Sequence, residues 1–119
     1  MIYVVTPVFN RIHFTYQYLN ALQKQTTDLF KVVIIDDGST DGTPEMVERY
    51  FPDVILLREK GGLWWAEATN IGVKFSIDNG ASYILTLNDD TIPEHDFIEK
   101  MIHWSDLFPQ TLLGALALN

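Results

Sequence analysis

The sequence predicts an α/β fold, in which an open, doubly wound, mostly parallel sheet carries helices on both faces. Short runs of apolar and β-branched residues alternate with longer segments of helical periodicity. The runs "KVVII" and "YILTL" are almost continuously apolar, which is typical of parallel strands covered on both faces. Because crossovers between parallel strands are right-handed, this alternation favours a Rossmann-like sheet. The 119 residues suffice for one such domain with a modest core.

Five strands are expected, because each run is short, apolar and followed by polar or turn-forming residues. They are predicted at residues 2–6, 31–36, 54–58, 83–88 and 112–118. The last run, "LLGALAL", is strongly apolar, and we expect its edge and one face to be open. Open apolar edges pair with other chains, so self-association through this strand is a further expectation.

Helices are predicted between the strands, because apolar side chains recur there at helical spacing. Thr43 followed by Pro44 predicts an N-cap and a first helical position. Residues 78–80, "DNG", predict the end of a helix. Pro93 predicts the start of the last helix, with acidic residues in its first turn. The shared helical faces are formed by Phe14, Tyr18, Ala21, Leu22 and Gln25, by Ala68, Ile71, Gly72 and Phe75, and by Phe97, Ile98, Met101 and Ile102.

Composition and net charge limit the kinds of molecule that the protein can bind and the compartment in which it is expected. The net charge of −8 argues against nucleic acid, and an acidic protein that binds an anion needs backbone amides, a helix N-terminus or a metal cation. The chain has no cysteine, no basic leader and no long apolar run. We therefore expect a cytoplasmic protein, with membrane association of a longer chain left open.

Two pairs of adjacent carboxylates follow predicted strands: Asp36-Asp37 and Asp89-Asp90. Adjacent like charges are costly near a core, but the carboxyl ends of parallel strands meet at one edge of the sheet, where ligands bind. We expect both pairs at the floor of one cleft. There they could bind Mg²⁺ or Mn²⁺ and accept hydrogen bonds from a nucleobase. A turn at the first pair and a helix cap at the second are the alternatives.

At this point the chain resembles a known family, the family 2 glycosyltransferases, whose nucleotide-sugar-binding fold is called GT-A. The resemblance is carried by "TPVFNR", "VVIIDDGSTDGT", "GGLWWAEATNIG" and "YILTLNDDTIPEHDFIEKM", in the family's order and spacing. Each segment alone is a weak signal, but together they are specific and cover nearly the whole chain. The resemblance implies the nucleotide-binding half of a GT-A domain, occupying residues 1–119 and incomplete at its C-terminus.

For the nucleoside, the resemblance implies that Pro7 and Phe9 line the base pocket and that Asp37 contacts the base. We place Asp36 with these nucleotide-binding residues. A bond from Asp36 to nearby backbone or to an arginine is its alternative role.

For the diphosphate, "NDD" stands where the family carries its D-x-D metal motif. Asp90 would ligate a divalent metal, Mg²⁺ or Mn²⁺, and Asp89 would face the ribose or the metal. Asn88 departs from the commoner leading aspartate, which leaves the division of roles open. Members often have an arginine within the segment matching residues 61–72, where this chain has Trp64 and Trp65.

We expect those two tryptophans to be packing residues, and we expect Arg11 to pair with a carboxylate at the sheet edge.

The function implied is transfer of a sugar, with inversion, from a nucleotide-diphosphate sugar to a hydroxyl of an acceptor. The family's catalytic base is expected beyond Asn119, so no residue here is assigned that role and the fragment alone is expected to be inactive. The acceptor, a glycan or a lipid-linked molecule, is left open. The alternative function is a non-catalytic nucleotide-binding or regulatory module.

Overall fold

The computed structural model describes residues 1–108 and confirms the predicted α/β architecture. The strands are β1 (Ile2–Val8), β2 (Phe30–Asp36), β3 (Ile55–Arg58) and β4 (Tyr83–Thr86), and the helices are α1 (Ile12–Gln23), α2 (Thr43–Tyr50), α3 (Trp64–Asp78) and α4 (Phe97–Leu107). The predicted strand at residues 112–118 lies outside the described residues, and its role in self-association stays a prediction.

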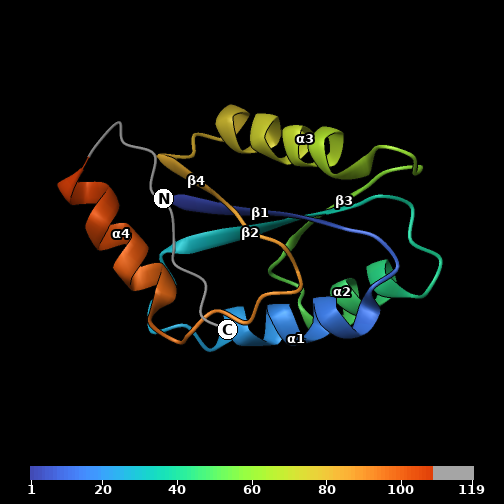
Figure 1. The fold of residues 1–119 in the computed structure, drawn as a ribbon, viewed down its shortest axis with the longest axis horizontal. Helices are drawn as coiled ribbons and strands as arrows, with labels where there is room; N and C mark the ends of the chain where they lie inside the picture. Colours follow the sequence, from blue (N-terminus) through green and yellow to red (C-terminus); the bar gives the residue numbers. More distant parts are fainter. Residues whose placement is uncertain (109–119) are drawn as a thin grey trace.

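The described strands form one parallel sheet in the order β3-β2-β1-β4. Helix α3 covers one face and helices α1 and α2 cover the other, while α4 lies toward the amino-terminal end of β1 (Figure 1). All four strands therefore end at the same edge, where the chain turns into α1, α2 and α3. Among the described helices, none is both long and apolar enough to cross a bilayer.

Each face of the sheet has its own apolar core. Alternate residues of the central strands, such as Val4 and Ile34, pack with Tyr18, Leu19 and Val47 from α1 and α2. The intervening residues, such as Val5, Val33 and Ile35, pack with Ala68 from α3. This two-sided burial explains why the strand sequences do not alternate between apolar and polar residues.

Gly72 lies where α3 packs closely against the sheet. A Cβ atom there would lie 2.5 Å from both Ile35 Cδ1 and Val5 Cγ1. A side chain at this position would meet both strands, so glycine lets the middle of α3 pack closely against the sheet.

Strand β1 runs two residues past the predicted end, through Pro7 to Val8. Proline is tolerated in this central strand because Pro7 lies beyond the paired part of β4, whose register with β1 ends at Val5↔Thr86. Strand β4 is correspondingly shorter than predicted and leaves residues 87–90 in a loop.

The prediction that Pro93 starts the last helix is wrong, because α4 begins at Phe97. The side chain of Gln25 explains the delay. Its Nε2 donates to the carbonyl of Glu94 (2.7 Å), and its Oε1 accepts from the amide of Ile98 (2.9 Å). These two backbone groups would bond to each other in a helix, so Gln25 takes the place of that helical turn.

Helix α2 begins one residue earlier than predicted. Gly42 occupies its N-cap position and Thr43 is its first residue. The capping acceptor is the carboxylate of Asp41, whose Oδ1 accepts from the amide of Thr43 (3.1 Å). Its Oδ2 accepts from the amide of Ile12, the first residue of α1 (3.0 Å). One side chain therefore caps two helices at the site edge of the sheet.

Candidate functional site

A cavity of about 260 Å³ opens at the carboxyl edge of the sheet. It collects Pro7, Phe9, Asp37, Asp89 and Asp90, which the sequence predicts to share a site. A larger cavity of about 930 Å³ lies at the opposite end of β2 and contains none of the predicted site residues. The full lining of the smaller cavity is Pro7, Val8, Phe9, Arg11, Asp37, Trp64, Trp65, Ala68, Asn88, Asp89 and Asp90.

Asp36 is the predicted site residue that does not line this cavity. Its side chain is only 2% exposed, and Oδ2 accepts a hydrogen bond from the amide of Ser39 (3.0 Å). Within residues 1–108 its other oxygen, Oδ1, is buried without a partner. This geometry matches the alternative of a bond to nearby backbone, and a contact of Asp36 with a nucleotide stays a prediction.

Asp37 is buried and joins β2 to the start of α3. Its Oδ1 accepts from the amide of Leu63 (3.0 Å), and its Oδ2 accepts from the amide of Trp64 (3.1 Å). The first amides of a helix lack partners within it and carry partial positive charge, so a carboxylate is stabilised there. Each oxygen retains a second lone pair, which leaves Asp37 able to accept another donor from the cavity.

The loop that precedes α3 has an unusual backbone. Gly61 and Gly62 have φ angles of +113° and +78°, and Trp64 has a φ of +62°. A left-handed conformation is rare for a bulky residue and costs energy, so surrounding contacts must hold it. The two hydrogen bonds from the amides of Leu63 and Trp64 to Asp37 supply such contacts. They hold the backbone at the position from which the Trp64 side chain lines the cavity.

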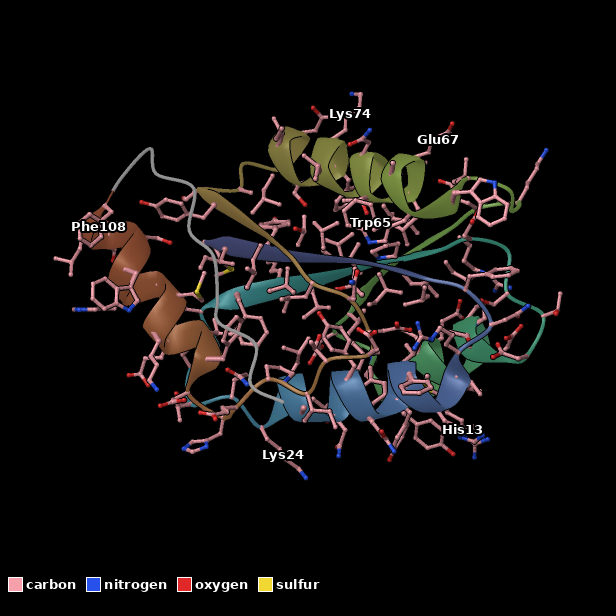
Figure 2. The ribbon with its side chains drawn as sticks, viewed as in Figure 1. His13, Lys24, Trp65, Glu67, Lys74 and Phe108 are labelled. Atoms are coloured by element: carbon pink, nitrogen blue, oxygen red, sulfur yellow. The ribbon has the colours of Figure 1, made fainter. Side chains whose placement is uncertain are left out.

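The expectation that the tryptophans are packing residues is wrong. Trp64 is 81% exposed and Trp65 is 56% exposed, and both line the cavity. Figure 2 shows Trp65 extending from α3 toward the strands, whereas Glu67 of the same helix points away from them. The indole Nε1 of Trp65 donates a hydrogen bond to Asn88 Oδ1 (2.8 Å). The adjacent glycines Gly61 and Gly62 indicate a turn before the tryptophans, but no feature of the sequence indicates their exposure.

Asp89 is the most constrained carboxylate of the cavity, with a residue exposure of 5%. Its Oδ2 accepts from the hydroxyl of Thr15 (3.0 Å), and its Oδ1 lies 3.7 Å from Arg11 Nη1. Burial raises the pKa of Asp89 above its usual range, although the Thr15 hydrogen bond and the Arg11 charge oppose that change. The expected pairing of Arg11 with a carboxylate at the sheet edge is confirmed.

Asp90 differs from Asp89, because its side chain is exposed at the cavity. In the part of the chain that the structure describes, its carboxylate enters no hydrogen bond or ion pair with another side chain. No three His, Cys, Asp or Glu side chains in that part gather closely enough to hold a metal alone. Mg²⁺ is commonly held by one or two carboxylates together with waters and substrate phosphates. Asp90 is better suited than Asp89 to be such a carboxylate ligand, because Asp89 is already bonded to Thr15 and paired with Arg11.

Three contacts of the site were missed by the sequence analysis. They are the hydroxyl of Thr15 on Asp89, the indole of Trp65 on Asn88 and the backbone amides on Asp37. Each joins residues more than 20 positions apart, so no local pattern of residues signals it.

Comparisons with known proteins identify the family and support the fold. The sequence matches the family model "Glycosyl transferase family 2" over residues 3–109. It is 32% identical over 104 residues to an uncharacterized glycosyltransferase of Rickettsia bellii, covering 87% of this chain and 15% of that protein.

Two solved structures are also similar. The first, S. aureus TarS 1–349 in complex with UDP-GlcNAc, has a TM-score of 0.77 and 24% identity, covering 89% of this chain and 31% of that one. The second, the mannosyltransferase PcManGT of Pyrobaculum calidifontis with GDP-Man and Mn²⁺, has a TM-score of 0.74 and 25% identity, covering 87% and 32%. The chain therefore spans a third or less of these relatives.

Proposed function

Since the chain belongs to glycosyl transferase family 2, we propose that it forms the donor-binding half of an enzyme that transfers a sugar from a nucleotide-diphosphate sugar to a hydroxyl acceptor. The observation that carries this proposal is the cavity at the carboxyl edge of the sheet. It brings together an exposed aromatic ring, a capping carboxylate and a second acidic pair from three separate loops. Ligands of open parallel sheets bind at this edge.

The nucleoside end of the donor is proposed to lie between β1 and β2. Phe9 is half exposed beside Pro7, and an exposed aromatic ring is a stacking surface for a base. Asp37 is fixed by two backbone amides and can still accept an N–H from the base edge. A contact that is positioned before the ligand arrives loses little entropy on binding.

The diphosphate end is proposed to lie at the loop after β4. A protein with a net charge of −8 repels a diphosphate unless cations intervene. Asp90 would hold a divalent metal such as Mg²⁺ or Mn²⁺, and the presence of Mn²⁺ with GDP-Man in the PcManGT structure supports this assignment. A bound metal would neutralise the charge that develops on the departing diphosphate. Asp89 is already paired with Arg11, so a second cation is not needed beside it. We therefore assign Asp89 to a hydrogen bond from the ribose.

The proposed reaction is an inverting displacement. The acceptor oxygen forms a bond to the anomeric carbon as the bond from that carbon to the diphosphate oxygen breaks, and the acceptor proton passes to a base. We assign that base to none of the described residues. The contribution of residues 1–108 is to bind and orient the donor.

Calorimetric titration tests this proposal. UDP, GDP and dTDP are each added to the protein with and without Mn²⁺. We expect one of them to bind, and to bind more tightly with Mn²⁺. Absence of affinity for all three under both conditions would overturn the proposal. Binding without transfer, in a protein that includes the rest of the enzyme, would instead favour a non-catalytic nucleotide-binding module.

A further inference from the structure

The hydrogen bond between Trp65 and Asn88 connects the two sides of the cavity. Trp65 is the second residue of α3, and Asn88 directly precedes the acidic pair Asp89-Asp90. Both side chains line the cavity, and the indole Nε1 lies 2.8 Å from the amide oxygen Oδ1. The bond therefore crosses from the helix that covers the sheet to the loop that follows β4.

The chemistry of the two groups fixes how they meet. An indole N–H can only donate, so the amide of Asn88 must present its oxygen to Trp65. An aspartate could also accept this bond, but it would place a third carboxylate beside Asp89 and Asp90. The asparagine at the start of "NDD" supplies an acceptor without adding charge.

The loop after β4 has few other anchors. The amide of Leu87 donates to the carbonyl of Val5 (3.1 Å), and Asp89 is held by Thr15 and Arg11. Asp90 has no side-chain partner of its own among residues 1–108, so its position follows from its neighbours in the chain. The bond to Asn88 restrains the chain two residues before Asp90.

We propose that Asn88 is a positioning residue, which acts through Trp65 to hold Asp90 in the place required to bind the metal and diphosphate of the donor. This inference rests on the proposed function. Both partners are exposed, so water competes for the bond and it contributes little to stability. Its effect is expected on the geometry of the acidic loop rather than on folding.

The test compares Asn88→Ala, Asn88→Asp, Trp65→Phe and the double variant Asn88→Ala/Trp65→Phe with the unmodified protein. Affinities for UDP, GDP and dTDP are measured by calorimetry with and without Mn²⁺. Loss of one hydrogen bond predicts that Asn88→Ala and Trp65→Phe each weaken the Mn²⁺-dependent affinity by about threefold to tenfold. The double variant should be no weaker than either single variant, because both remove the same contact. Asn88→Asp keeps an acceptor but adds a carboxylate beside Asp89 and Asp90, so it tests whether the bond to the Trp65 indole is retained rather than whether the affinity is unchanged.

Two controls separate positioning from a general structural effect. Trp104→Phe removes an exposed indole from α4, outside the cavity, and should leave both affinities unchanged. The indole ¹H–¹⁵N resonance of Trp65, assigned from its absence in Trp65→Phe, should shift in Asn88→Ala and stay close to its original position in Asn88→Asp. Nucleotide affinity without Mn²⁺ should fall less in the Asn88 and Trp65 variants than the affinity with Mn²⁺ does, although both residues line the cavity.

Wild-type Mn²⁺-dependent affinity that persists in Asn88→Ala would overturn this inference and leave the proposed function standing. An equal loss with and without Mn²⁺ would also overturn it, because the contact would then support the cavity as a whole. Absence of nucleotide binding by the unmodified protein would overturn both the proposed function and the inference.

Discussion

The hydroxyl of Thr15 donates a hydrogen bond to Asp89 Oδ2 across 3.0 Å, joining residues 74 positions apart in the sequence. Thr15 lies in the first turn of α1 and is fully buried, and Asp89 lies in the loop after β4. The contact places the acidic loop against the helix that follows β1. It also compensates a carboxylate whose pKa is raised by burial and lowered in part by this hydrogen bond.

Thr15→Val should lower the free energy of unfolding. Valine has a similar shape and cannot donate, so Asp89 would be left buried with a lost partner, at a cost of about 1–3 kcal/mol. Urea denaturation at neutral pH measures the change. Thr15→Ser keeps the hydroxyl and should recover most of the stability. Equal stability of Thr15→Val and the unmodified protein would show that water replaces the threonine.

Asp90→Ala should abolish the part of nucleotide-diphosphate affinity that depends on Mn²⁺ and leave the fold intact. The carboxylate is exposed, so its removal costs no packing. Calorimetry with and without Mn²⁺ measures the effect, and the melting temperature should not change. Asp106→Ala removes an exposed carboxylate from α4 and serves as the control. Unchanged Mn²⁺-dependent affinity in Asp90→Ala would contradict its assignment as the metal ligand.

Asp37→Ala should weaken nucleoside binding even without metal. A hydrogen bond to a charged group contributes about 1.5–3 kcal/mol, which corresponds to a loss of roughly tenfold to a hundredfold. The variant should also be less stable, because the amides of Leu63 and Trp64 lose their acceptor. Calorimetry and urea denaturation separate the two effects. Lower stability with unchanged nucleoside affinity would assign Asp37 to the loop alone.

Asp41→Asn should lower stability in a way that depends on pH. Burial raises the pKa of Asp41, but hydrogen bonds from Thr43 and Ile12 outweigh it and bring the pKa below its ordinary 3.8. A lowered pKa means that the charged carboxylate stabilises the fold above the ordinary value, and that this contribution is lost as the pH falls through the lowered one. The loss at neutral pH should be about 0.5–1.5 kcal/mol, because asparagine keeps only one of the two oxygens that accept from Thr43 and Ile12.

Urea denaturation of Asp41→Asn and the unmodified protein from pH 7 down to pH 3 provides the measurement. The difference between the two proteins should be constant near neutral pH and shrink below pH 3.8. A difference that stays the same over the whole range would show that the charge of Asp41 is not what caps the two helices.

Gly72→Ala should lower the free energy of unfolding, although alanine favours helix by about 1 kcal/mol. The added methyl would meet Val5 and Ile35, and overpacking of this kind costs about 1–3 kcal/mol. Asn70→Ala, at an exposed position of the same helix, is the matched control and should be neutral or slightly stabilising. Thermal unfolding compares the two variants. A more stable Gly72→Ala would show that the two side chains move aside at little cost.

The features that the sequence predicted correctly are those with a local pattern. The order of strands and helices follows from periodicity, and the gathering of Asp37, Asp89 and Asp90 follows from the rule that parallel strands end at one edge. The misplaced start of α4 has a tertiary cause, because Gln25 bonds to backbone groups that the helix would otherwise use. The conformation of Trp64 could not be predicted either, because its φ of +62° accompanies a bond from its amide to Asp37, 27 positions earlier in the chain.

The strand order also sets the distance between the two acidic groups of the cavity. Asp37 follows β2 and Asp89 follows β4, and β1 lies between them. Neighbouring strands are spaced about 4.8 Å apart, so the two acidic groups belong to positions separated by roughly 10 Å across the sheet. Backbone hydrogen bonds between the strands impose this separation. The site therefore selects ligands whose two recognition groups lie a matching distance apart. Changes of side chain in the loops can alter what is recognised at either end, while the strands keep the distance between the ends constant.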